Sequence, residues 1–270
     1  MLMSNFLKNR KSIRDFKEKN VDKKVLEELM DYGRKLESNT ANNNFKFILV
    51  EDGKLVYKAL SGKGGYAGVM IKSPHYIALE FLDESDECII NASYAMESLI
   101  TKASELNLGS CWINIVDVEE DIKKVLFELK NGKVDYLLAI GYPVAKNPFG
   151  QEGESCRLAI EEIVYKDEIG NKIDMDELEN RGLSDLFYYI RFAPSSYNNQ
   201  PWRFILKDDR IVLTLMCTDN KYSLVDAGII MYYFENMAKS IGLNGKWKLL
   251  HDEGREVDKV FYKSIGEFYI

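Results

Sequence analysis

The chain has 270 residues, 46% of them hydrophobic and 29% charged, which is ordinary for a globular protein with a sizeable core in one large domain or two small ones. Its 36 basic and 43 acidic residues give a formal net charge of -7 without a basic stripe, so we expect no nucleic-acid partner. No apolar run approaches the ~18 residues of a membrane span, and residues 1–16 lack the apolar centre of a signal peptide, so no membrane association is expected.

Cysteine and histidine are used sparingly. The four cysteines are widely spaced and form no C-x-x-C motif. This pattern favours free thiols in a reducing cytoplasm over a disulfide framework or a zinc site. With only two histidines in the chain, a histidine-based metal centre is not expected either. We therefore expect a cytoplasmic protein without a metal.

The N-terminal segment carries the first candidate binding pattern. Arg10, Ser12 and Arg14 alternate along the chain, so an extended backbone would place all three on one face. Two guanidiniums and a hydroxyl on one face could clamp a phosphate, because arginine binds phosphate oxygens bidentately. A solvated basic turn explains the same spacing, and from spacing alone it is the commoner explanation.

Apolar periodicity predicts a series of helices and strands over residues 22–141. Asp22 is expected to cap the first amphipathic helix, and the longest helix, over residues 86–106, is apolar on more than one side and therefore central. A glycine-rich loop at residues 61–68 lacks the spacing of a Walker or Rossmann fingerprint. The other predicted elements are strands over 45–50, 75–81, 111–116 and 134–140 and a helix over 119–129.

A polar, acidic stretch then separates this series from a shorter one. We expect a first domain over residues 1–165, a linker over 166–182 and a second domain over 183–270. The second domain is predicted to contain a helix over 183–190, a hairpin of strands 202–206 and 211–215, and a helix over 226–241. The mixed composition of residues 247–270 predicts no element.

The most distinctive segment is the loop between the predicted helix 183–190 and the strand 202–206. Pro194 and Pro201 fix φ and stiffen this loop. Its short polar side chains, which supply donors and acceptors at nearly consecutive positions, are Ser195, Ser196, Asn198, Asn199 and Gln200. Such a loop could bind a polar small molecule at low entropic cost, or its side chains could satisfy its own backbone. Composition leaves the two about equally favoured.

The two halves of the sequence also repeat one another. A shift of 157 residues gives eight identities in the 21 columns from Tyr32 to Asp52, without a gap. A second shift, of 135 residues, places Ala103 on Ala238 in the second long helix. These periods are too long for a solenoid, so the pattern indicates two copies of one unit fused in a chain.

The loop sequence APSSYNNQPWRF, at residues 193–204, resembles the Pro-Ser-Ser-x-Asn-x-Gln-Pro-Trp motif of the FMN-dependent nitroreductase family. The Arg-x-Ser-x-Arg pattern near the N-terminus resembles the phosphate-binding opening of that family. The resemblance implies FMN as cofactor, with its phosphate held by Arg10, Ser12, Arg14 and Arg157. It assigns the remaining FMN contacts in the loop to Pro194, Ser195, Ser196, Asn198 and Gln200.

The strand at residues 111–116 extends the resemblance. In the family, the residues after a tryptophan in this strand present a backbone amide toward flavin N5, and here these residues are Ile113 and Asn114. Asn114 stands where the family usually has glycine. Family members often have Lys-x-Arg at the second half of the phosphate site. This chain keeps Arg157 but has Ser155 in place of the lysine.

The resemblance implies an α+β, nitroreductase-like fold. Its two related halves, with antiparallel-type sheets and central helices, would form an intramolecular pseudo-dimer around one FMN, so a monomer is expected. It also implies an enzyme that passes hydride from NAD(P)H to a small acceptor such as a nitroaromatic or a quinone. FMN performs the hydride chemistry, so no catalytic acid or base is named. A non-catalytic FMN-binding protein, for flavin storage or redox sensing, is the alternative.

Overall fold

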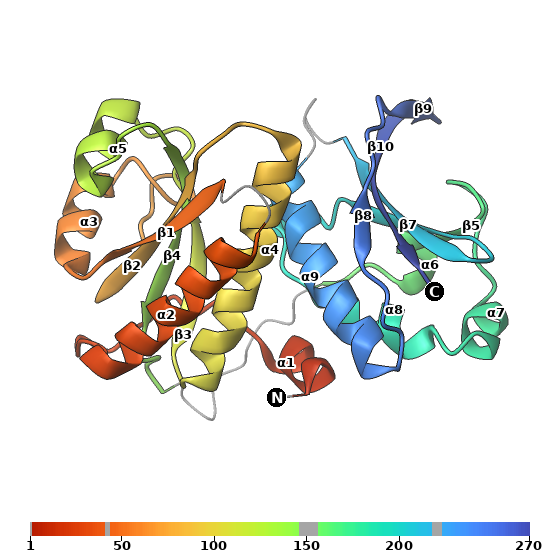
Figure 1. The fold of residues 1–270 in the computed structure, drawn as a ribbon, viewed down its shortest axis with the longest axis horizontal. Coiled ribbons are helices and arrows are strands. Elements are labelled where there is room, and N and C mark those ends of the chain that lie inside the picture. The colour runs from red at the N-terminus through yellow and green to blue at the C-terminus, as the bar shows by residue number, and fades with distance from the viewer. Residues whose placement is uncertain (1, 41–43, 146–155, 218–222) are drawn as a thin grey trace. The chain divides into compact units, whose positions relative to one another are not determined.

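A computed structural model of the chain describes residues 2–40, 44–145, 156–217 and 223–270 (Figure 1). The chain divides into two compact units, one of Lys11–Glu152 and one that combines Met1–Arg10 with Gly153–Ile270. The N-terminal helix α1 (Met3–Asn9) belongs to the second of these, because its Phe6 ring stacks on Tyr233 with 6.1 Å between ring centroids. No helix in the described ranges is long and apolar enough to cross a membrane.

The unit of Lys11–Glu152 is built on a four-stranded antiparallel sheet with the strand order β1-β2-β4-β3. Its strands are β1 (Phe45–Val50), β2 (His75–Phe81), β3 (Gly109–Asn114) and β4 (Lys133–Gly141). Helices α2 (Lys23–Asn39) and α4 (Asp86–Glu105) pack on one face, and α3 (Gly53–Leu60) and α5 (Glu120–Phe127) on the other (Figure 1). Every residue of the central strand β2 is buried, because both faces of the sheet are covered.

Local sequence signals begin these elements where we predicted them. The Asp22 carboxylate accepts a hydrogen bond from the Lys24 amide at 2.9 Å and caps α2, as expected. The bounds of β1 and β2 agree residue for residue with the predicted strands. The long helix α4 is apolar on several sides and lies against the sheet, as its sequence indicated.

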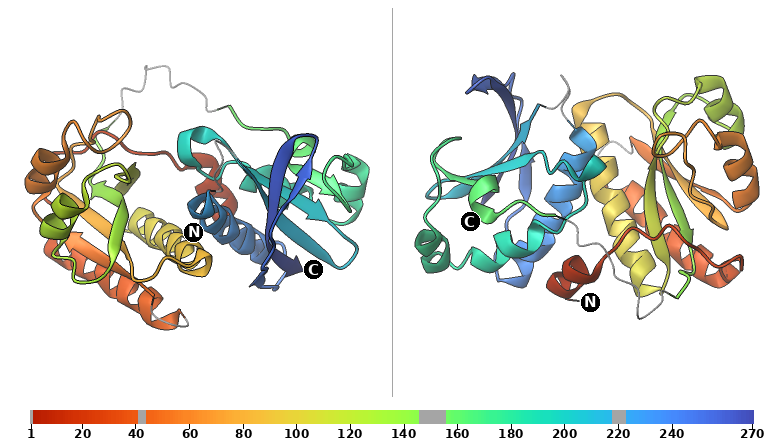
Figure 2. Two further views of the ribbon diagram at one scale, coloured as in Figure 1. Left: turned by 90° about the horizontal axis from the view of Figure 1, so that it is seen from above. Right: turned by 180° about the vertical axis from the view of Figure 1, so that it is seen from behind.

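The other unit contains a six-stranded sheet with the path β5-β6-β7-β10-β8, while β9 pairs with β10. Its strands are β5 (Val164–Lys166), β6 (Trp202–Leu206), β7 (Arg210–Met216), β8 (Trp247–Leu249), β9 (Arg255–Val257) and β10 (Val260–Tyr269). Helix α9 (Leu224–Ser240) lies against one face of this sheet beside α8 (Ser184–Ile190) (Figure 2). The rings of Phe187, Phe204, Trp247 and Phe268 all contact Phe234 of α9 and form the aromatic centre of this core.

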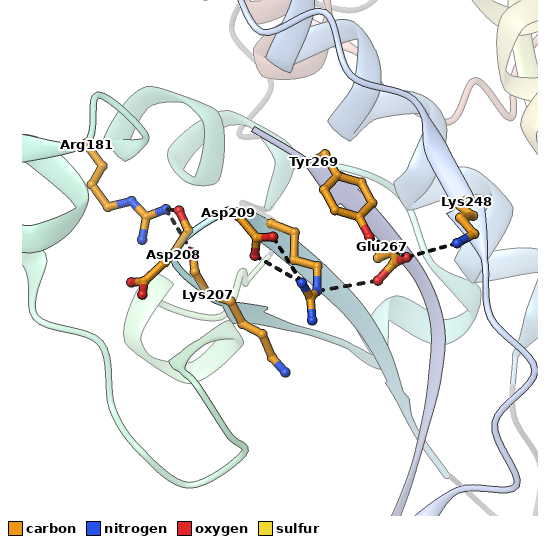
Figure 3. Close-up of polar contacts among 8 residues, drawn as sticks. Arg181, Lys207, Asp208, Asp209, Lys248, Glu267 and Tyr269 are labelled. Carbon is orange, nitrogen blue, oxygen red and sulfur yellow. Dashed lines mark hydrogen bonds and ion pairs between the residues drawn. The ribbon is translucent and has the colours of Figure 1, made fainter.

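Within the described residues, no pair of helices like α3 and α5 covers the opposite face of this sheet. Glu267 lies on this face, because it pairs with Val212 of the small apolar cluster there. The Glu267 carboxylate forms ion pairs with Arg210 at 3.4 Å and Lys248 at 3.5 Å and accepts a hydrogen bond from the Tyr269 hydroxyl (Figure 3). Charged groups that pair with one another therefore occupy part of a surface that helices bury in the other unit.

The two units repeat one topology, as the sequence repeat predicted. Numbered along the chain, the strands β1 to β4 follow the order first-second-fourth-third, and β6, β7, β8 and β10 follow the same order. In both units a long helix connects the second strand to the third, and these helices are α4 and α9. The unit with α9 adds β5 at one edge and β9 beside β10.

The bounds of the two compact units differ from the domains expected at residues 1–165 and 183–270 and the linker expected at 166–182. β5 pairs in parallel with β6, so residues 164–166 join the sheet of the C-terminal unit. Helix α7 (Met175–Asn180) packs against α8 of the same unit and is capped by Asp174. The expected linker is therefore an ordered part of that unit. The unassigned tail supplies β8, β9 and the ten residues of β10.

The tail should be essential to the stability of its unit. The Phe268 ring is fully buried and lies 5.1 Å from the Phe234 ring and 5.4 Å from the Trp247 ring, between centroids. Phe268→Ala should lower the free energy of unfolding by about 3–5 kcal/mol, measured by urea denaturation with circular dichroism. Phe261→Ala is the control, because Phe261 lies on the same strand but is 51% exposed. Equal losses in the two variants would contradict this packing.

Candidate functional site

The distinctive polar loop, residues 193–201, adopts a strained backbone in the unit that contains α8 and α9. It includes one short 3-10 turn at Ser196–Asn198. Tyr197, Asn198 and Gln200 have φ values of 52°, 59° and 47°. This left-handed conformation costs roughly 1–2 kcal/mol for each residue other than glycine. Contacts with the rest of the unit must therefore hold the loop in place.

Two hydrogen bonds fix the loop from within its own unit. The Ser195 hydroxyl accepts from the Gln200 amide at 2.9 Å. The carboxylate of Asp226, a residue that is 2% exposed on α9, accepts from the Ser196 amide at 3.0 Å. The side chain of Ser195 thus satisfies the loop's own backbone, which was one of the two roles that the sequence left open.

The loop also holds a neighbouring segment, Cys156-Arg157-Leu158, which we call the strap. The Asn198 side-chain amide donates to the Cys156 carbonyl at 2.8 Å. The Gln200 side-chain oxygen accepts from the Leu158 amide at 2.9 Å. Gln200 is 4% exposed, so its bond to the Leu158 amide is shielded from water. The structure therefore brings the motif residues together with the strap that carries Arg157.

The Arg157 guanidinium is the main charged group in this arrangement. Its Nη1 donates to the Ala193 carbonyl and to the Asn198 side-chain oxygen, both at 2.8 Å. Its Nε is buried and has no hydrogen-bond partner in the described structure. Burial, and secondarily the charge of Arg10, lowers the pKa of Arg157 to about 10. The group is still charged at neutral pH, but its charge is poorly solvated and uncompensated.

Arg10 follows α1 directly, and its backbone amide donates to the Phe6 carbonyl at the end of that helix. It belongs to the same unit as Arg157. Within the described ranges, neither guanidinium forms an ion pair with a carboxylate. Two like charges without a counter-ion repel each other, and a bound anion would relieve this cost. Guanidiniums bind phosphate oxygens in a bidentate manner, so a phosphate ester fits this pair.

Ser12 and Arg14, the other two residues of the predicted phosphate clamp, belong to the unit of Lys11–Glu152. They flank Ile13, whose amide donates to the Ser110 carbonyl of β3 at 2.9 Å. The segment thus runs beside the edge strand β3. A Cβ added to Gly109 would lie only 2.8 Å from the Ile13 side chain, so the two backbones approach closely. Residues 10–15 form no helix here, so the alternating pattern lies on a non-helical backbone.

The register of β3 separates the roles of Ile113 and Asn114. In an antiparallel strand each residue directs its amide and its carbonyl to the same edge, and successive residues alternate between the two edges. The carbonyls of Ser110 and Asn114 accept from Ile13 and Gly65, outside the sheet, so the even-numbered residues face the open edge. The Ile113 amide therefore faces β4, while that of Asn114 faces outward and has no partner in the described structure. Of the two residues, only Asn114 directs its backbone amide away from the sheet.

Sequence reasoning missed a buried carboxylate near this edge. Glu97 on α4 is fully buried, and its Oε1 accepts from the Trp112 indole nitrogen at 2.7 Å. This bond ties the central helix to the residue next to Ile113. A glutamate within the apolar stretch Ala95–Ile100 was the available signal, since a charge there needs a partner. No group of acidic, histidine and cysteine residues in the described ranges could hold a metal ion.

Comparison with known proteins identifies the family. The family model described as "Putative TM nitroreductase" matches residues 3–238. A crystal structure described as a "putative nitroreductase" from Thermotoga maritima is 17% identical, with 98% of this chain and 94% of that chain covered and a TM-score of 0.58. No curated protein matches the chain.

Two further crystal structures resemble the chain less closely. A nitroreductase with bound FMN from Bacteroides fragilis is 17% identical, with 58% of this chain and 98% of that chain covered and a TM-score of 0.46. An NADH dehydrogenase/NAD(P)H nitroreductase from Bacteroides thetaiotaomicron is 18% identical, with 56% and 92% covered and a TM-score of 0.46. The family match, which spans most of the chain, carries the assignment: the chain belongs to this nitroreductase family and is an oxidoreductase with a nitroreductase-like α+β fold.

Proposed function

We propose that the chain binds one FMN and passes hydride from NAD(P)H to a small organic acceptor such as a nitroaromatic or a quinone. The observation that carries this proposal is the pair of guanidiniums, Arg10 and Arg157, which no carboxylate in the described ranges neutralises. They lie in the unit that also contains the motif loop. A buried Nε without a partner on Arg157 is the kind of donor that a phosphate ester would satisfy.

The residues of this chain would bind and orient the cofactor. Arg10 and Arg157 hold its phosphate. Pro194, Ser195 and Ser196 shape the loop beside the cofactor. Bound FMN supplies the hydride chemistry itself, so the protein contributes position and electrostatics. We assign no catalytic acid or base.

One site per chain follows from the differences between the two halves. In the repeat, Glu37 stands where Pro194 stands. Its carboxylate accepts from the Phe47 amide of the edge strand β1 at 2.7 Å, and burial raises its pKa. The equivalent strand β6 is instead completed by β5. The first copy thus uses this position to finish a sheet edge, and an acidic group there disfavours an anionic ligand. We infer that a single chain imitates a dimer that has lost one of its two sites.

The purified protein should be yellow and should contain FMN at about one per chain. Saturating the apo-protein with FMN and comparing flavin and protein absorbance gives the stoichiometry. Chromatography of the flavin released on denaturation identifies it. FAD in place of FMN, or a stoichiometry near two, would contradict the site as we assign it.

Arg10→Ala should weaken FMN binding by about ten- to hundredfold, because each charge-assisted contact contributes about 1.5–3 kcal/mol. Titration of the apo-protein, followed by quenching of flavin fluorescence, measures this change. Lys8→Ala is the matched control, since it removes the same charge from an exposed position on α1, the helix that Arg10 follows. Equal losses in the two variants would show that net charge, and not a contact with Arg10, governs binding.

Steady-state kinetics should show that NAD(P)H and acceptor use one pocket in turn. Double-reciprocal plots against NAD(P)H at several acceptor concentrations should then be parallel, as for other ping-pong reactions. Intersecting lines would mean that both substrates bind together. A holoprotein that oxidises neither NADH nor NADPH would instead support the non-catalytic role in flavin storage or redox sensing.

A further inference from the structure

Two side chains of the motif loop, those of Gln200 and Asn198, form hydrogen bonds with the strap. Gln200 uses its oxygen for the Leu158 amide at 2.9 Å and its nitrogen for the carbonyls of Asn198 at 3.1 Å and Cys156 at 3.4 Å. An amide nitrogen carries two hydrogens, so both of these donors are occupied. At 4% exposure the Gln200 side chain has neither the surface nor the spare donors to reach a ligand.

Asn198 contacts the strap through both ends of its side-chain amide. Its nitrogen donates to the Cys156 carbonyl at 2.8 Å, and its oxygen accepts from Arg157 Nη1 at 2.8 Å. The next residue, Asn199, offers a contrast, because it is exposed and its side chain forms no hydrogen bond in the described structure. The left-handed backbone at Tyr197 and Asn198 turns Asn198, and not Asn199, toward the strap.

These bonds determine which edge of the Arg157 guanidinium remains available. Both hydrogens of Nη1 are used, one on the Ala193 carbonyl and one on Asn198. Nε has no partner, and no hydrogen bond in the described structure involves Nη2. Nε and Nη2 together form one edge of the planar fork, which can bind two oxygens of a phosphate at once. The loop therefore fixes the plane of the guanidinium and leaves the Nε–Nη2 edge without a partner in the described structure.

We propose that Asn198 and Gln200 are positioning residues, which hold the strap and aim the Arg157 guanidinium, and that they do not contact the flavin. This inference rests on the proposed function for its ligand, and it departs from the resemblance, which assigns both residues to direct FMN contacts. Asn198 acts on Arg157 itself. Gln200 acts one step further away, through the backbone on either side of Arg157.

A double-mutant cycle in FMN binding tests this role. Asn198→Ala and Arg157→Ala should each weaken FMN binding by about ten- to hundredfold. The double variant should bind no more than about threefold more weakly than Arg157→Ala alone, because residues that act through one contact are not additive. Asn199→Ala is the matched control and should bind FMN as the wild type does. Circular dichroism and thermal unfolding establish that each variant is folded.

Riboflavin, which lacks the phosphate, separates positioning from direct contact. Under our proposal Asn198→Ala leaves riboflavin affinity within about threefold of the wild type. Losses that multiply in the double variant, or a fall in riboflavin affinity equal to that for FMN, would overturn the positioning role.

Inorganic phosphate provides a test that does not depend on flavin. Phosphate should bind the wild type at least about tenfold more tightly than it binds Asn198→Ala, measured by calorimetric titration. A wild type that binds phosphate but neither flavin contradicts the proposed function, and the phosphate comparison still decides the positioning role. Equal phosphate affinity in the two proteins would overturn that role.

Discussion

The constraint on which the candidate site depends is the cost of burying a guanidinium without a counter-ion. Arg157 donates to two neutral oxygens, keeps a buried Nε without a partner, and lies near the like charge of Arg10. Burial of an unpaired charge is usually avoided or compensated by an ion pair. A fold that keeps this arrangement gains most from an anion that supplies the missing acceptors, and we propose that this anion is the phosphate of FMN.

The fold supplies this constraint through contacts between segments that are distant in sequence. α1 brings Arg10 into the C-terminal unit, and the strap brings Arg157 to the loop that follows α8. Asp226 at the start of α9 holds the loop through the Ser196 amide. The two copies of the topology differ at this loop, and this difference is why only one such site is proposed. In the first copy Glu37 completes the edge of β1, so the repeat has preserved the sheet but not the loop.

Sequence patterns predicted what depends on local periodicity and motif spacing. β1, β2, α4, the hairpin β6–β7 and α9 were found because their apolar faces are regular. The strands of the tail were not predicted. Lys248 and Glu267 interrupt the apolar pattern because they lie on a polar face, and β10 pairs with β7, which lies more than 40 residues earlier in the chain. The residues of the candidate site came from the motif. The sequence could not show that Asn198 bonds Arg157, nor which of Ile113 and Asn114 faces the open edge, because both depend on long-range register.

The most direct test of the account is a crystal structure of the protein with FMN bound. We predict that phosphate oxygens lie within about 2.7–3.2 Å of guanidinium nitrogens of both Arg10 and Arg157, with the Nε edge of Arg157 engaged. Arg157 should keep its bond to Asn198 in that complex. A phosphate bound away from both arginines, with Arg157 Nε still without a partner, would contradict the claim that this uncompensated charge forms the cofactor site.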